Sequence, residues 1–319
     1  MAAIDPLRTL AKCQMISLLP VGEEQFTVRR DVLLELAVEP TSAVRELTEG
    51  TVQYIAASMG LDLHIEQETG QFLLGGCSEK ALNGALAMLR NIVGDGVRSG
   101  AVQSAYRESV KGPADADYSH KTQSGGAGEF ARVIVRVAPS ASLWGVQFRN
   151  DDANGNVPSE FVDAVEKGAR DAAEMGVLMG MPLIATEIRL IDGAYHDVDS
   201  SPAAFEQAAR CAVIEALRRA KVRLMEPLAT VAVLTPEQHV TAIADELRRR
   251  NASPREVQMG STSTIAASSR MFDLLGFEAA LNSISGDEAR TTFILSGFAE
   301  VPSDRSPLDT MPAAAALRA

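Results

Sequence analysis

The stretch "LDLHIEQETGQFLLGG" (residues 61–76) decides the fold of the first part of this chain. Two runs of alternating β-forming residues surround a turn at Glu68-Thr69-Gly70, which predicts a β-hairpin. Residues 41–60 read as a helix that opens with an N-cap candidate and stops at Gly60, and residues 78–96 read as a second helix with a glycine stop. With a strand over residues 31–38 and a short last strand, the order becomes β-α-β-β-α-β, the ferredoxin-like pattern.

The same order returns near the other end of the chain, over residues 226–303. "PLATVAVLT" (227–235) is a predicted strand, and the helix that follows at 236–251 has Pro236 at its start. After a loop come a strand at 261–268, a helix at 269–283 and a strand at 290–301. The sequence therefore predicts two similar α+β units around a different one.

The middle unit, 105–225, opens with "AYRESV" and a polar, glycine-rich stretch, "HKTQSGGAGEF" (120–130). Strands are predicted at 131–139 and 183–193, and amphipathic helices at 157–176 and 201–220. A basic cluster ends the second helix: Arg218, Arg219, Lys221 and Arg223. A solvated helix face is the ordinary interpretation of such a run.

Composition limits the classes of protein that this chain fits. Its 319 residues carry a formal net charge of −12, which argues against a generic coat for nucleic acid. The apolar runs are strand-length and too short to span a membrane, and no signal peptide is recognisable at the start. Cys13, Cys77 and Cys211 are isolated thiols, so we expect a reducing, cytoplasmic compartment and no metal site.

Enzymatic motifs are not found. The sequence has no G-x-x-x-x-G-K-[ST] phosphate loop and no G-x-S-x-G nucleophile elbow. "SGGAGEF" precedes a strand rather than a helix and lacks a lysine, which disfavours phosphate binding. We therefore expect no catalytic residue, no cofactor and no bound metal.

The loop "GAYHDVDSSPAAF" (193–205) leaves two interpretations open. Its histidine and aspartates could bind a metal, although a zinc site needs more donors than this segment offers. The favoured interpretation is helix capping, in which Asp197 or Asp199 caps the next helix while Ser200 or Ser201 is the N-cap before Pro202. An exposed polar loop of this kind suits recognition better than chemistry.

Five ordered motifs resemble bacterial translation elongation factor G, in its fourth and early fifth domains. They are "AYRESV" (105–110), "QSGGAGEF" (123–130), "VPSEFVDAVEKGARDA" (157–172), "GAYHDVDSSPAAF" and "MEPLATVAVLTPEQ" (225–238). "LAVEP" (36–40) followed by "ETGQFLLGG" (68–76) is similar to the third domain. The resemblance implies two ferredoxin-like domains, III at 31–104 and V at 226–303, flanking a ribosomal-protein-S5-like domain IV at 105–225. Residues 1–30 would be a remnant of domain II or a linker, and 304–319 a tail.

The resemblance also implies which residues contact the ribosome. In the family, two loops at the tip of domain IV enter the decoding region and follow tRNA and mRNA, with the histidine nearest the codon–anticodon duplex. The first loop matches Gln123, Ser124, Gly125, Gly126 and Gly128, and the second matches Gly193, Tyr195, His196, Asp197, Val198, Asp199 and Ser200. An arginine-rich helix end that contacts ribosomal RNA in the family matches Arg248, Arg249 and Arg250.

Several positions depart from the family pattern. Ala127 stands where a basic residue is usual, Glu129 where Gln is usual and Phe130 where Tyr is usual. Losing a base and gaining an acid weakens phosphate contact. The segments "GGCSEKALNG" (75–84) and "SGDEART" (285–291) also differ from the family, as does the Pro- and Ala-rich tail.

The resemblance implies a non-enzymatic protein, since the GTPase domain is missing from this sequence. We expect a cytoplasmic, elongation-factor-G-like protein that binds ribosomal RNA and the tRNA–mRNA complex and no membrane. Two alternatives remain open: a subunit that pairs with a separate GTPase chain, or a degenerate, truncated factor with weakened RNA binding.

Overall fold

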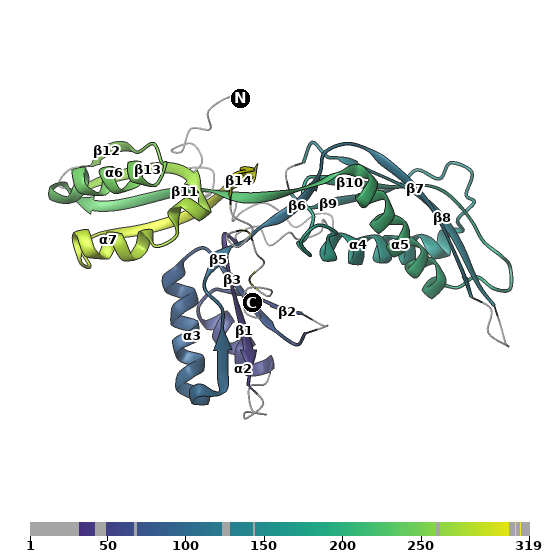
Figure 1. The fold of residues 1–319 in the computed structure, drawn as a ribbon, viewed down its shortest axis with the longest axis horizontal. Coiled ribbons are helices and arrows are strands. Elements are labelled where there is room, and N and C mark those ends of the chain that lie inside the picture. The colour runs from purple at the N-terminus through teal and green to yellow at the C-terminus, as the bar shows by residue number, and fades with distance from the viewer. Residues whose placement is uncertain are drawn as a thin grey trace. The chain divides into compact units, whose positions relative to one another are not determined.

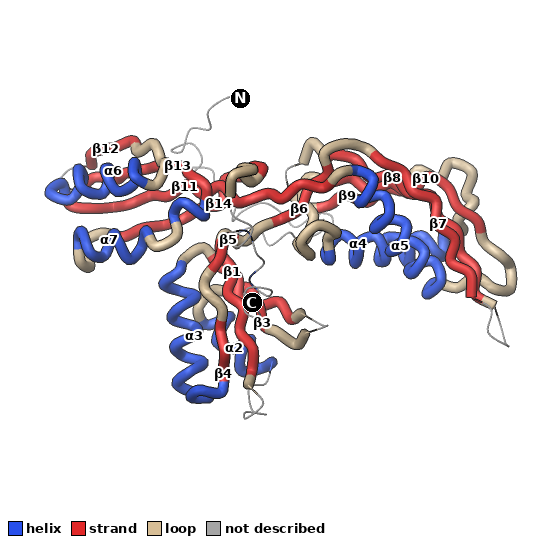
Figure 2. The backbone as a smooth tube through the Cα atoms, viewed as in Figure 1, coloured by secondary structure: helices blue, strands red, loops and turns tan. Residues whose placement is uncertain are grey.

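The computed structural model describes residues 32–41, 49–66, 69–122, 128–142, 144–259, 262–305, 310 and 313. They divide into two compact units. Unit 1 contains residues 32–105 and 226–305, and unit 2 runs from Tyr106 to Met225. Figures 1 and 2 show the elements of each unit.

The first sheet of unit 1 has the strand order β2-β3-β1-β4, and β5 pairs with β1. Its elements are β1 (Leu34–Pro40), α2 (Glu49–Ser58), β2 (Asp62–Ile65), β3 (Phe72–Gly76), α3 (Glu79–Val93), a 3₁₀ turn (Gly94–Gly96), β4 (Val97–Ser99) and β5 (Gln103–Ser104). The sheet is antiparallel, with Leu36 opposite Leu74. Both helices bury apolar side chains, including Ile55 and Leu82, in the core that these strands line. The predicted β-α-β-β-α-β order is confirmed.

The second sheet of unit 1 repeats this order as β12-β13-β11-β14. Its elements are β11 (Val222–Pro236), a 3₁₀ turn (Glu237–His239), α6 (Val240–Arg249), β12 (Arg255–Met259), β13 (Thr262–Arg270), a 3₁₀ turn (Met271–Leu274), α7 (Phe277–Ser285) and β14 (Arg290–Glu300). Strand β11 begins in unit 2, where its first four residues pair with β6, and continues in unit 1.

Unit 2 is a four-stranded sheet with two helices on one face, as Figure 2 shows. Its elements are β6 (Arg107–Val110), β7 (Ala114–Thr122), β8 (Glu129–Pro139), β9 (Val146–Asn150), α4 (Ser159–Met175), β10 (Thr186–Ala194) and α5 (Pro202–Ala220). The strand order is β7-β8-β10-β9, and β9 runs parallel to β10. The buried face of β8 carries Val133, Val135 and Val137, which join the alanine-rich faces of α4 and α5 in one core. The α+β class is confirmed.

Five strands were not predicted from the sequence: β5, β6, β7, β9 and β12. β7 reads "ADADYSHKT", and aspartate is a poor strand former. Here the outward face of β7 pairs with arginines of β8. Asp115 accepts two hydrogen bonds from Arg136 at 2.6 and 2.7 Å, and Arg132 binds the carboxylate of Asp117 in the same bidentate way. The hydrogen bond from the arginine holds the pKa of each aspartate below its usual range. The stretch predicted as a loop at 120–130 is also shorter, because His120–Thr122 and Glu129–Phe130 belong to the two strands.

Two helices begin later in the structure than the sequence predicts. The helix expected at 269–283 begins only at Phe277, because Gly276 adopts φ +77° and separates α7 from a 3₁₀ turn. The helix expected from Pro236 is a 3₁₀ turn until His239, and α6 starts at Val240. Of the helix expected at 41–60, residues 42–48 lie outside the described residues.

Candidate nucleic-acid interface

Two segments meet where α5 begins in unit 2. The β7–β8 hairpin has Thr122 opposite Glu129 as its last described pair. The segment between β10 and α5, Tyr195–Ser200, lies against the first residues of β8, because the Phe130 N–H donates to the Asp199 carbonyl at 2.8 Å. We call this end of unit 2 the tip, and Tyr195–Ser200 the second tip loop.

A closed turn shapes the second tip loop. The Ser200 N–H donates to the His196 carbonyl at 3.1 Å, and the Ser200 hydroxyl accepts the His196 N–H at 2.9 Å. The same hydroxyl donates to the Phe130 carbonyl at 2.7 Å. Ser200 therefore closes the turn and ties it to β8, so the loop is held without a ligand.

The imidazole of His196 projects from this turn, with 57% of its side chain exposed. Its Nδ1 lies 3.4 Å from the Val198 N–H nitrogen and 3.3 Å from that of Asp199, in donor geometry, and 3.3 Å from Asp199 Oδ2. An unprotonated Nδ1 accepts from the backbone, whereas a protonated Nδ1 donates to the carboxylate, so the two arrangements exclude each other. Two backbone donors, which cannot change their protonation, favour an accepting Nδ1. The neutral ring then carries its proton on the outward Nε2.

The remaining side chains of this loop differ in their surroundings. Val198 is 80% exposed and Tyr195 47% exposed, so two apolar groups flank the histidine. Asp197 is exposed and has no hydrogen-bond or ion-pair partner among the described residues. Asp199 is half-buried and lies beside Gly128, where a Cβ would be 3.3 Å from the Asp199 carboxylate. The loop offers an imidazole donor, an exposed tyrosine, the apolar surface of Val198 and an unpaired acid.

The first tip loop is described only at its end. Gln123, Ser124, Gly125 and Gly126 lie outside the described residues, as does Ala127, and Gly128 is half-buried. Glu129 accepts hydrogen bonds from His120 and Thr122, each at 3.1 Å. The bond from His120 is the main reason why the pKa of Glu129 lies below its usual range. Glu129, the acid that departs from the family pattern, therefore stabilises the end of the β7–β8 hairpin.

Lys121 and Gly193 are two further residues of the tip region. Lys121 places its ammonium 5.4 Å from the Phe130 ring centroid, which supplies a cation close to the loop. Gly193 was grouped with the second loop, but it is buried in β10. A Cβ there would lie 2.4 Å from Val157 Cγ2 and 2.5 Å from the Arg132 carbonyl oxygen. Gly193 is therefore required by packing.

The three arginines at the end of α6 are also unlike one another. Arg250 is 20% exposed; it binds Glu246 at 2.6 Å, donates to the carbonyls of Asp273 and Leu275, and stacks over Phe277. Arg248 pairs with Asp245 and Arg249 with Glu246, and these two remain 60% and 71% exposed. The geometry thus gives Arg250 a structural task and leaves Arg248 and Arg249 available to a partner.

Capping is the interpretation of "HDVDSS" that the structure supports. Ser201 is the N-cap of α5, its hydroxyl accepts the Ala204 N–H at 3.2 Å, and Pro202 is the first helical residue. Neither aspartate takes part in the cap: Asp199 bonds within its own turn. Within the described ranges no three His, Cys, Asp or Glu side chains are grouped as metal ligands.

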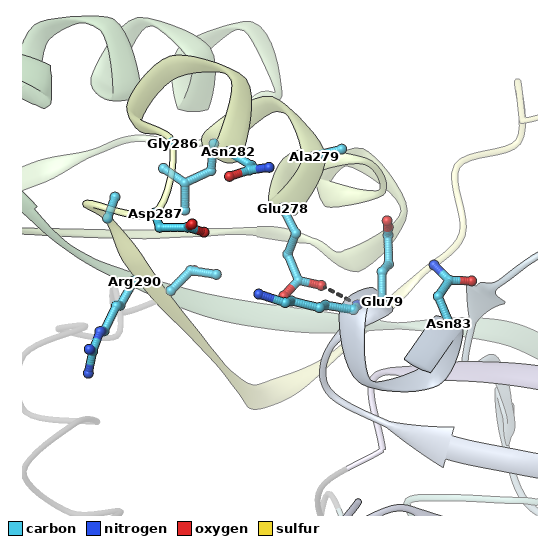
Figure 3. A pocket seen from close by; sticks show the side chains of 12 residues that line it. Glu79, Asn83, Glu278, Ala279, Asn282, Gly286, Asp287 and Arg290 are labelled. Atoms are coloured by element: carbon cyan, nitrogen blue, oxygen red, sulfur yellow. Dashed lines mark hydrogen bonds between the residues drawn. The ribbon is translucent and has the colours of Figure 1, made fainter. Parts of the chain in front are cut away.

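A cavity of about 580 Å³ lies in unit 1 where α3 and α7 begin (Figure 3). The two helix starts exchange caps. Glu278 accepts from the Ser78 hydroxyl at 2.8 Å and from the Lys80 N–H at 3.0 Å, and Glu79 accepts from the Gly276 N–H at 2.7 Å. Burial is the main reason why the pKa of Glu79 is raised. The two carboxylates of the lining, Glu79 and Glu278, are therefore engaged in holding the helix starts.

Comparison with known proteins assigns the family. Residues 102–221 match the family model "Elongation factor G, domain IV", and residues 223–307 match "Elongation factor G C-terminus". The chain belongs to the elongation factor G family. Elongation factor G of Granulibacter bethesdensis is 36% identical over 273 residues, which is 85% of this chain and 39% of that protein. The Paracoccus denitrificans factor is 35% identical over 290 residues, 90% of this chain and 41% of its own length.

The resemblance stated from the sequence is confirmed: the chain is similar to the C-terminal part of elongation factor G. A crystal structure of a protein from Thermus thermophilus matches with a TM-score of 0.64 and 29% identity, over 88% of this chain and 44% of that one. Because the alignment with the Paracoccus denitrificans factor covers 90% of this chain, it includes most of the β1–β4 sheet. The chain spans about two fifths of the length of the curated relatives it matches. No helix in the described part of unit 1 or unit 2 is long and apolar enough to cross a membrane.

Proposed function

We propose that this chain binds the ribosome through the tip of unit 2 and acts in translation elongation as a relative of elongation factor G. The observation that carries the proposal is the second tip loop, whose exposed His196 stands on a turn already closed by Ser200. A loop that is ordered before binding loses little conformational entropy when it meets RNA. The cytoplasm is the compartment that this function requires.

The tip geometry supports the contact residues that we propose. His196 offers Nε2–H to a phosphate or a 2′-hydroxyl, both of which accept hydrogen bonds. Tyr195 and Val198 offer apolar contact to a base or ribose. Ser200 and Asp199 hold the loop. The first tip loop, Gln123–Gly128, belongs to the proposal by resemblance, and Arg248 and Arg249 are proposed to contact ribosomal RNA from unit 1. We propose domain boundaries at 104/105 and 225/226.

Cosedimentation with purified 70S ribosomes at low salt tests this function. We expect the chain to pellet with ribosomes and His196→Ala to weaken that binding about tenfold, the effect of losing one charge-assisted or buried hydrogen bond. His239→Ala is the matched control, because His239 bonds Glu288 on a 3₁₀ turn of unit 1. Wild-type protein that stays in the supernatant, or equal binding by both variants, would refute the proposal.

A separate GTPase chain is the partner that a second arm of this experiment tests. We propose that the chain itself has no GTPase activity, since its sequence lacks the phosphate loop that holds the nucleotide. Phosphate release from GTP should stay at the ribosome background. If ribosome binding appears only after a GTPase-domain protein and GTP are added, the pairing-subunit interpretation replaces ours. Ribosome binding too weak to saturate would instead favour the degenerate factor.

A further inference from the structure

The basic cluster at the end of α5 is not used by the tip. Lys111 and Lys221 are neighbours, because Val110 pairs with Val222 and the Lys111 N–H donates to the Lys221 carbonyl at 3.0 Å. Arg218 lies in the last turn of α5, three positions before Lys221 at the C-cap, so both belong to the same helix end. The second tip loop lies at the opposite end of this 19-residue helix, separated from Pro202 only by the N-cap Ser201. The helix is about 28 Å long.

Lys221 holds an unusual backbone conformation for its residue type. It is the C-cap of α5 with φ +56° and ψ +86°, in the left-handed region. Glycine adopts this region without strain, whereas a residue with a Cβ does not, and glycine is accordingly the common residue at such helix ends. A lysine in this conformation carries backbone strain that a role of its side chain would offset.

Neighbouring acids do not neutralise the side chains of Arg218 and Lys221. Glu215 pairs with Arg219 at 2.9 Å, and Asp115 binds Arg136 through two hydrogen bonds. The side chains of Arg218 and Lys221 are exposed and have no hydrogen-bond or ion-pair partner among the described residues. In a chain of net charge −12, these two unpaired cations give this helix end a local positive charge.

The helix dipole does not account for Lys221 either. Cations near a helix C-terminus are favourable, but Arg218 and Arg219 already occupy the last turn of α5. Lysine and arginine that project from one small area offer the point charges and forked donors that bind phosphate oxygens. The chemistry of this area therefore fits a polyanion with closely spaced phosphates.

We propose that Arg218 and Lys221, with Lys111 beside them, form a second RNA-binding surface that contacts the phosphate backbone of double-stranded RNA. This surface, which we call the α5 basic surface, reads no bases and needs no part of the tip. It would set the orientation of unit 2 on RNA while the tip makes its own contacts, since phosphate contacts fix position without reading sequence.

Fluorescence anisotropy with a labelled RNA duplex of arbitrary sequence, titrated at several salt concentrations, tests this surface. Lys221→Gly is the decisive variant, because glycine suits the left-handed conformation and the fold should keep or gain stability. We expect this variant to bind the duplex several-fold more weakly. The slope of log affinity against log salt should fall by about one for the lost phosphate contact. Arg218→Glu should weaken binding more than tenfold.

Lys167→Ala is the matched control for net charge. Lys167 is an exposed lysine of α4 in the same unit, paired with Glu206 at 2.5 Å, and its removal should leave the salt slope unchanged. Equal slopes for Lys221→Gly and Lys167→Ala, or no duplex binding by the wild-type chain at low salt, would overturn the proposal. His196→Ala should bind the duplex like wild type. The two proposals can fail separately. If His196→Ala does not change ribosome binding but Lys221→Gly still weakens duplex binding, the proposed function is refuted and the α5 basic surface is supported.

Discussion

Ser200 lies 2.7 Å from the carbonyl oxygen of Phe130 and donates its hydroxyl proton to it. The two residues belong to different segments of unit 2, and the bond fixes the turn that carries His196 against the start of β8. Because the same hydroxyl also accepts the His196 N–H, one side chain both closes the loop and attaches it. Its neighbour Ser201 caps α5 and has no part in the loop.

Ser200→Ala should therefore release the loop, whereas Ser201→Ala should only weaken the helix. We expect each change to lower the unfolding free energy of unit 2 by about 1–2 kcal/mol, from lost hydrogen bonds in the first and a lost cap in the second. Trp144, the single tryptophan of the chain, reports unit 2 unfolding by fluorescence. Ribosome binding should fall several-fold for Ser200→Ala and stay unchanged for Ser201→Ala. Equal binding by both would show that the loop does not need this attachment.

The tautomer of His196 is the second prediction. Backbone donors around Nδ1 should leave it unprotonated, so ¹⁵N NMR of the neutral ring should show the proton on Nε2. His196→Gln keeps an N–H near the outward position, whereas His196→Asn keeps an oxygen near Nδ1 and loses the outward donor. We expect ribosome binding to survive better in the Gln variant. A proton found on Nδ1, bonded to Asp199, would contradict this arrangement.

Sequence patterns were sufficient for the elements that bury an apolar face. The hairpin at 61–76 and the helix at 157–176 carry regular apolar periods, and both form as predicted. β7 could not be predicted in this way, because its stability depends on arginines of β8 that approach only in the folded sheet. α7 starts late for a related reason, since Gly276 is capped by Glu79, almost 200 positions earlier.

The candidate site was predictable only in part. His196 and the N-cap at Ser201 stand out in the sequence, because their residue types and the following proline have few structural interpretations. The difference between Arg250 and its neighbours was not visible, since three identical letters gave no sign that one guanidinium packs on Phe277. The left-handed backbone conformation of Lys221 could not be predicted from the sequence either, because it depends on the connection between α5 and β11.

Glu108 is a fully buried carboxylate that holds the segment after α4. Its two oxygens accept the N–H groups of Val177, Leu178, Met179 and Met181, at distances between 2.7 and 3.1 Å. Glu108→Gln replaces one acceptor by a donor that would face these N–H groups. We expect unit 2 to lose about 2–4 kcal/mol of unfolding free energy. Urea denaturation followed at Trp144 measures the loss. The exposed Glu160→Gln should change stability by less than about 0.5 kcal/mol.

Glu79 should make the stability of unit 1 depend on pH. Since burial raises its pKa in the folded protein, the folded state favours the protonated acid. Its stabilising effect is fully present below the ordinary glutamate pKa and is lost as pH rises through the raised value. Glu79→Gln keeps the acceptor for the Gly276 N–H and removes this dependence. Hydrogen exchange at that N–H should slow with decreasing pH in wild type, beyond the intrinsic chemical effect, but not in the variant. The exposed Glu49→Gln should retain the wild-type profile.

Gly168 brings α4 into contact with the backbone of α5. A Cβ at this position would lie 2.1 Å from the Glu206 carbonyl oxygen, far inside van der Waals distance, and a backbone atom cannot move aside as a side chain can. Gly168→Ala should therefore push the helices apart and cost about 1–3 kcal/mol, even though alanine is the better helix former. Gly112→Ala is the control, since a Cβ there meets open space. An increase in the urea midpoint of Gly168→Ala, measured by Trp144 fluorescence, would show that α4 and α5 are not in such close contact. The position of the second tip loop, which precedes α5, would then also be wrong.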